Sequence, residues 1–153
     1  MEMLAVIAII AILATLAIPS YLSRIIRDEI AAAVQLADIA KAPVALAWTA
    51  TQTFPLNNAA AGLPAADKIV NNYVKSIAVQ DGAIQITFGN SASGVINGKI
   101  LTLRPAVVED APIVPVAWVC GNANPPEKMT VKGENRTDIP VNYLPLNCRS
   151  LVR

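Results

Sequence analysis

The chain opens with an apolar run that water does not solvate. No charged residue occurs between Met3 and Ser23, and Thr15 is the only polar side chain between Met3 and Pro19. A helix rises about 1.5 Å per residue, so the run up to Pro19 spans roughly 25 Å, close to the ~30 Å hydrocarbon core of a bilayer. The run therefore predicts a helix that lies in lipid or packs against copies of itself.

Glu2 places a carboxylate at the head of this apolar run. An ionised acid costs about 2.5–3.5 kcal/mol at the centre of a bilayer and less near its surface. A buried carboxylate therefore needs a cation or hydrogen-bond donors, and the N-terminus of its own helix supplies part of this requirement. Two interpretations stay open: an ordinary first-turn residue among lipid headgroups, or a carboxylate that requires a partner.

Pro19 interrupts the hydrogen bonding of the predicted helix. A proline inside a helix removes one backbone hydrogen bond, here freeing the carbonyl of Thr15, and costs about 3 kcal/mol. The simplest consequence is a kink, which neighbouring helices tolerate.

Helical patterning continues beyond the apolar run. Charged residues mark its end at Arg24 to Glu29, and apolar residues then recur at alternating spacings of four and three: Ile26, Ile30, Ala33, Ala37, Ala40, Val44 and Ala47. This stripe predicts an amphipathic helix half over residues 25–48, which packs on a globular domain along one side. Pro43 either kinks this half or ends its first part. Residues 1–24 form the half that needs apolar surroundings on every side.

The remaining chain predicts a sheet between two irregular segments. Residues 49–72 form a connecting loop, with a short helix around residues 65–71. Residues 73–121 contain four strands, over 73–79, 83–88, 99–104 and 116–120, the first two joined by a tight turn at Asp81-Gly82. Ile84, Ile86 and Phe88 share one face of their strand. Residues 122–153 form a proline-containing loop and tail. The fold class is α+β, one long helix packed on a four-stranded antiparallel sheet.

The two cysteines, Cys120 and Cys148, could be free, metal-bound or paired. A zinc site needs about four ligands, and the chain has no histidine to complete one. The pattern favours a disulfide, which indicates an oxidising compartment and would hold the C-terminal loop to the last strand. A pair of buried free thiols is the alternative.

Charge and motifs argue against several classes of function. The formal net charge is +1, from twelve basic and eleven acidic residues, which disfavours strong nonspecific nucleic-acid binding. The absence of histidine removes the commonest general base and metal ligand. No phosphate-cradling glycine loop or recognisable acid pair is present, so we expect neither an enzyme nor a cofactor or metal site.

Motifs along nearly the whole chain resemble those of type IV pilins. Glu2, the Ala/Ile/Leu run and Pro19-Ser20-Tyr21 are similar to the N-terminal signature of that family. The stretches at 73–77, 97–103, 118–121 and 143–149 resemble type IVa major pilins, and the cysteine pair with Leu144-Pro145 before the second cysteine is the more specific feature. The N-terminal signature alone is shared with secretion pseudopilins.

The resemblance implies the type IV pilin fold, with a C-terminal disulfide-bounded loop, and a structural role. The subunit would lie in the inner membrane, lose a short basic leader, and be polymerised by the pilus assembly machinery into an extracellular homopolymer. This filament would serve adhesion and twitching motility, with DNA uptake as a further role. Glu2 would bind the N-terminus of a neighbouring subunit, and the helix near Pro19 would lose structure in the fibre. Ala11 stands where the family often has glycine, which makes such melting less assured.

Three alternatives keep the same opening helix. A minor DNA-uptake pilin would show a basic face and salt-sensitive DNA binding. A type II secretion pseudopilin usually lacks the terminal disulfide loop and often binds calcium there. A membrane-tethered domain would never polymerise, and electron microscopy of sheared surface material separates it from the others.

Overall fold

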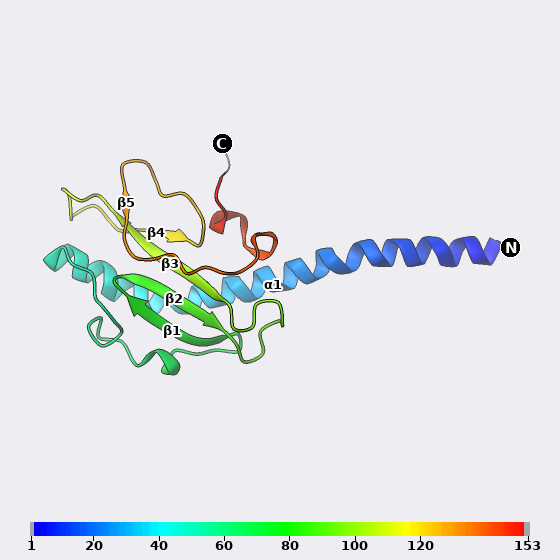
Figure 1. The fold of residues 1–153 in the computed structure, drawn as a ribbon, viewed down its shortest axis with the longest axis horizontal. Helices are drawn as coiled ribbons and strands as arrows, with labels where there is room; N and C mark the ends of the chain where they lie inside the picture. Colours follow the sequence, from blue (N-terminus) through cyan, green and yellow to red (C-terminus); the bar gives the residue numbers. More distant parts are fainter. Residues whose placement is uncertain (1, 152–153) are drawn as a thin grey trace.

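The computed structural model describes residues 2–151, without the side chains of residues 17–19, and consists of one long helix and one antiparallel sheet (Figure 1). Helix α1 spans Glu2–Thr51, somewhat beyond the predicted end near Trp48. Its N-terminal half extends away from the rest of the molecule, and its C-terminal half lies along the sheet (Figure 1). The α+β architecture expected from the sequence is therefore confirmed.

The buried side of α1 is the predicted stripe. Its first six positions, from Ile26 to Val44, have no exposed surface, because the 3.6-residue period places them on one side of the helix. The stripe ends at Trp48 rather than at Ala47, since the Trp48 indole stacks on the Phe54 ring with centroids 4.9 Å apart. Pro43 does not end the helix, which continues for two further turns.

The sheet has strand order β1-β2-β3-β4, with β5 added beside β3. The strands are β1 Val74–Gln80, β2 Ala83–Phe88, β3 Ile100–Val107, β4 Ala117–Cys120 and β5 Thr130–Val131. All pairs are antiparallel. The two-residue β5 was not expected, since Thr130 and Val131 carry too short a pattern to predict a strand. Short 3-10 helices η1 (Ala66–Lys68), η2 (Val141–Tyr143) and η3 (Leu146–Cys148) lie outside the sheet.

The β1–β2 hairpin has the predicted tight turn. Asp81 and Gly82 both have positive φ, 50° and 85°, as a two-residue hairpin turn of this hand requires. A Cβ added at Gly82 would approach the Phe54 side chain to 2.6 Å, so the turn also needs glycine for space.

Both faces of the sheet are covered. Ile84, Ile86 and Phe88 pack on α1 with no exposed surface, as their alternation predicts. Gln85 and Thr102 are also buried on the opposite face, because the C-terminal segment crosses it. Thr102 Oγ1 donates to Gln85 Oε1 at 2.5 Å and accepts from the backbone N–H of Arg136 at 2.9 Å, while Gln85 Nε2 donates to the Glu134 carbonyl at 3.1 Å.

Glu29 is buried, although the sequence suggested only that it marks the end of the apolar run. Its carboxylate accepts hydrogen bonds from the backbone N–H and the hydroxyl of Ser93, at 3.0 and 2.9 Å. Donors of this kind satisfy a desolvated carboxylate, so Glu29 fastens the β2–β3 loop (89–99) to α1.

Replacing Phe88 by alanine tests the packing of the sheet on α1. Phe88→Ala is expected to lower the free energy of unfolding of the detergent-solubilised chain by about 3–5 kcal/mol, because it leaves a cavity under the helix. Urea denaturation followed by near-ultraviolet circular dichroism measures the change. Ile113, 87% exposed, gives the control: Ile113→Ala should change stability by less than about 0.5 kcal/mol. Equal losses in both variants would contradict this account of the core.

Candidate assembly site

Among the described side chains of α1, those of residues 2–16 extend away from the folded head (Figure 1). Its large apolar side chains are 53–77% exposed, and they are Met3, Leu4, Val6, Ile7, Ile9, Ile10, Ile12, Leu13 and Leu16. Among the described residues, α1 is the one helix whose length and composition suffice to cross a membrane, with a mean hydropathy of 2.5 over its most apolar stretch. This exposed surface is the candidate assembly site.

The energy of this exposed surface is large compared with the stability of a small domain. Full burial of a Leu, Ile, Val or Met side chain contributes about 1.5–3 kcal/mol, so nine such residues represent roughly 15–25 kcal/mol. Soluble monomers rarely expose a continuous apolar patch of this kind. The structure therefore describes a chain whose helix needs an apolar environment from outside itself.

Glu2 lies in the first turn of α1, and its side chain is exposed. Within residues 2–151 it has no hydrogen-bond donor or cation as a partner. Its carboxylate is thus available to a group from another molecule, at the end of α1 farthest from the head (Figure 1).

Pro19 lies within α1, whose backbone is helical through residues 17–19. The side chains of these three residues lie outside the described part of the structure. Thr15 Oγ1 donates to the Ile12 carbonyl at 2.7 Å, one turn back along the helix, so this hydroxyl is satisfied within its own helix.

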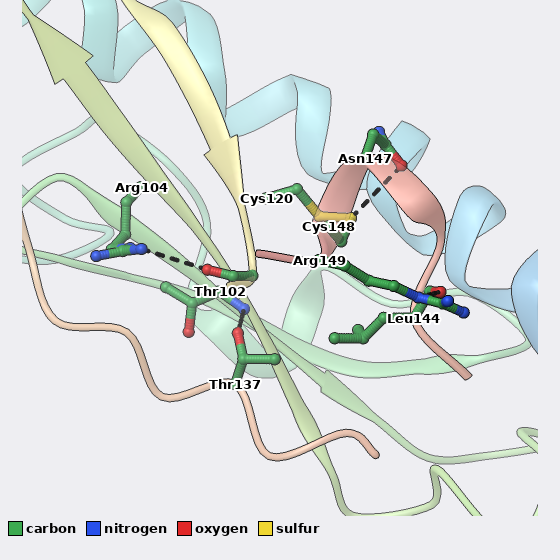
Figure 2. The surroundings of a disulfide bond; sticks show 9 residues. Thr102, Arg104, Cys120, Thr137, Leu144, Asn147, Cys148 and Arg149 are labelled. Atoms are coloured by element: carbon green, nitrogen blue, oxygen red, sulfur yellow. Dashed lines mark hydrogen bonds between the residues drawn. A yellow bond between two sulfur atoms is a disulfide. The ribbon is translucent and has the colours of Figure 1, made fainter. Parts of the chain in front are cut away.

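The disulfide lies in the head, between the last strand of the β1–β4 meander and the C-terminal segment. Figure 2 shows Cys120 at the end of β4 joined to Cys148 in η3, across a sequence separation of 28 and a Cα–Cα distance of 4.6 Å. The backbone N–H of Asn122 donates to the Cys148 carbonyl at 3.0 Å. Gly121 has φ 52°, and a Cβ there would approach that carbonyl oxygen to 3.0 Å, so glycine fits the close crossing of the two segments.

Hydrogen bonds continue from the disulfide across the sheet (Figure 2). Arg104 Nη2 donates to the Gly121 carbonyl at 3.3 Å, and the backbone N–H of Thr102 donates to Thr137 Oγ1 at 3.0 Å. Burial lowers the pKa of the Arg104 guanidinium from its ordinary value, because removal from water disfavours the charged form. These bonds hold the loop that the disulfide closes against β3.

Within residues 2–151, no three His, Cys, Asp or Glu side chains gather in a way that could hold a metal ion. The two positions that sequence reasoning placed in assembly, Glu2 and Pro19, lie far along α1 from the two cysteines. Sequence reasoning missed Glu29, Gln85 and Thr102, whose partners come from segments distant in the chain. In the sequence each of them is visible only as a polar residue among apolar ones, and this pattern does not predict which residue it bonds.

Comparison with known proteins agrees with this architecture. A family model described as Pilin (bacterial filament) matches residues 27–149. The fimbrial protein of Neisseria meningitidis serogroup A is 32% identical over 158 residues, covering 97% of this chain and 91% of that protein. The type IV major pilin protein PilE of Neisseria gonorrhoeae is 31% identical over 155 residues, covering 97% and 90%. The fimbrial protein EcpC of Eikenella corrodens is 31% identical over 154 residues, covering 98% and 88%.

A long helix, apolar at its free end and packed on an antiparallel sheet with a disulfide-closed C-terminal loop, defines a class of filament-forming proteins. The matches cover nearly all of the head and the helix alike. The chain belongs to the pilin family.

Removing the disulfide tests its contribution to the head. The double variant Cys120→Ala/Cys148→Ala is expected to lose about 3–4 kcal/mol of unfolding free energy, because the unfolded chain regains the entropy that a loop of this length gives up. Urea denaturation in detergent measures the loss. A reducing agent should destabilise the unchanged chain by a similar amount and leave the double variant unaffected; stability that is indifferent to reduction would contradict the prediction.

Proposed function

We propose that this chain is the structural subunit of a type IV pilus and that it polymerises through α1 into an extracellular filament. One observation carries the proposal: the head is closed around its own core, whereas the apolar surface of α1 between Met3 and Leu16 is exposed and has no partner within the described residues. The names of the fimbrial and type IV pilin relatives support it.

The proposed mechanism is a change of surroundings for one helix. Residues 1–24 lie in the inner membrane before assembly, where lipid covers their apolar side chains, and residues 25–153 form the head outside it. On transfer to the filament, helices of identical subunits replace the lipid. Because such a contact joins different surfaces of successive copies, it does not close and produces an open fibre.

Glu2 gives the assembly its register in this mechanism. A carboxylate that enters an apolar bundle must find a cation or donors, and a neighbouring subunit's N-terminus provides both. Subunits out of register would leave the charge unpaired. Pro19 marks the part of α1 where a missing backbone hydrogen bond lowers the cost of local melting during packing.

The pilus assembly machinery of the inner membrane is the proposed partner before polymerisation, and adhesion and twitching motility are the proposed roles of the filament. The disulfide between Cys120 and Cys148 supports a pilin over a secretion pseudopilin, since it closes the C-terminal loop that the former group carries.

Replacement of Glu2 tests the proposal. Glu2→Ala is expected to leave the head folded and to reduce the yield of sheared filaments at least about tenfold, the effect of losing one charged contact of ordinary strength. Near-ultraviolet circular dichroism of the detergent-solubilised chain checks the fold, and electron microscopy with immunoblotting measures filaments. The control Asp67→Ala removes an exposed carboxylate from the head and should assemble normally. Filaments from Glu2→Ala at the level of the unchanged chain would refute the role of Glu2.

A further inference from the structure

The strand directions give the head two distinct ends. At the first, the proximal end, α1 enters the head, and the β2–β3 loop is held there by the bonds between Ser93 and Glu29. At the second, the distal end, the backbone N–H of Gly82 donates to the Pro55 carbonyl, just past the end of α1. Since β1 and β3 are both antiparallel to β2, the β3–β4 loop (108–116) lies at the same end as the β1–β2 turn (Figure 1).

Two arginines meet at the proximal end, and neither has an acidic partner among the described residues. Arg27 Nη2 and Arg149 Nη2 donate to the same oxygen, the Asn142 carbonyl, at 3.3 and 3.2 Å. Neither guanidinium forms an ion pair within residues 2–151. Each guanidinium has five N–H donors and keeps several of them unused, so the pair is suited to an incoming carboxylate.

The other charged residues near the proximal end do not cancel the positive charge of the arginine pair. Lys75 and Lys99 lie at the starts of β1 and β3, and Arg24 lies one turn before Arg27 on α1. The acids there are Asp28, Asp138 and the buried Glu29, whose carboxylate is bound by Ser93, while Asp138 accepts the backbone N–H of Ile100 at 2.6 Å. Beside the arginine pair, the side chains of Val141 and Leu146 are 57% and 76% exposed.

The distal end has the opposite character. Its two turns carry three exposed acids, Asp81, Glu109 and Asp110. Glu109 is paired with Lys132, whereas Asp81 and Asp110 have no ion pair in the described part of the chain. Ile113, in the same loop as Asp110, is 87% exposed.

We propose that the distal end of one head binds the proximal end of the next copy in the filament. Asp110 lies against the Arg27–Arg149 pair of the neighbour, and Ile113 packs on the neighbour's Val141 and Leu146. The contact joins two different surfaces and so repeats without closing, as a fibre requires. Opposite charges around an apolar centre fix its register. This inference rests on the proposed pilus function and adds a specific head-to-head contact to it.

A charge exchange tests the contact in cells that carry a type IV pilus machinery and express each full-length variant as their pilin. Arg27→Glu and Asp110→Arg, each alone, should reduce sheared filaments roughly fivefold to tenfold, because each replaces attraction by repulsion at every repeat. The double variant Arg27→Glu/Asp110→Arg should recover most of the yield, since the exchanged charges again attract. Asp110→Arg lies in an exposed loop and tests the contact even where Arg27→Glu disturbs the head.

The control is Asp67→Arg, which makes the same charge change at an exposed position in η1, a helix that contacts β1 and lies outside the β3–β4 loop. It should assemble normally alone and should not rescue Arg27→Glu. Equal rescue by Asp67→Arg would show an effect of net charge and overturn the contact. Loss in Arg27→Glu that neither acid reversal corrects would point to a lipid headgroup at the arginine pair, and would also overturn it. If the chain without any substitution forms no filaments, the pilus function itself is refuted. If the filament yield is the same in Arg27→Glu, Asp110→Arg and Asp67→Arg as in that chain, only the contact is refuted.

Discussion

The unburied apolar surface of α1 is the constraint on which the rest of the molecule depends. Roughly 15–25 kcal/mol of potential burial lies outside the head, which exceeds the 5–15 kcal/mol that holds a typical domain together. The head must therefore be complete without this surface, and it is: the stripe from Ile26 to Val44 fills the core from one side and the sheet fills it from the other. One continuous helix thus has two separate packing surfaces, one within the head and one that needs an environment outside it.

Local periodicity predicts most of this architecture. The sequence predicts the change near Arg24 from an all-apolar helix to a helix with an apolar stripe on one side. It also predicts the Asp81-Gly82 turn and the alternation of Ile84, Ile86 and Phe88. Each of these features depends on residues within a few positions of one another, where the periods of helix and strand apply directly. The family resemblance added the function, because its motifs run along nearly the whole chain.

Features formed by distant segments could not be predicted in the same way. Gln85 alternates as a solvent-facing residue, yet it is buried because the segment around Glu134 crosses the second face of the sheet. Glu29 has the sequence context of a surface charge and instead accepts two bonds from Ser93. The convergence of Arg27 and Arg149 on one carbonyl depends on where the C-terminal loop returns to α1. No short sequence pattern predicts these long-range contacts, since they depend on the topology of the whole fold.

The continuity of α1 has a mechanical consequence. Tension applied to a fibre of such subunits passes along α1 directly into the core of each head, because no loop interrupts the subunit's helix between Glu2 and Thr51. The stripe residues between Ile26 and Val44 are buried beneath the sheet, so pulling α1 out of the head would expose the whole core at once. The covalent bridge between Cys120 and Cys148 closes the C-terminal loop beside that helix. A head built in this way resists pulling as a single unit.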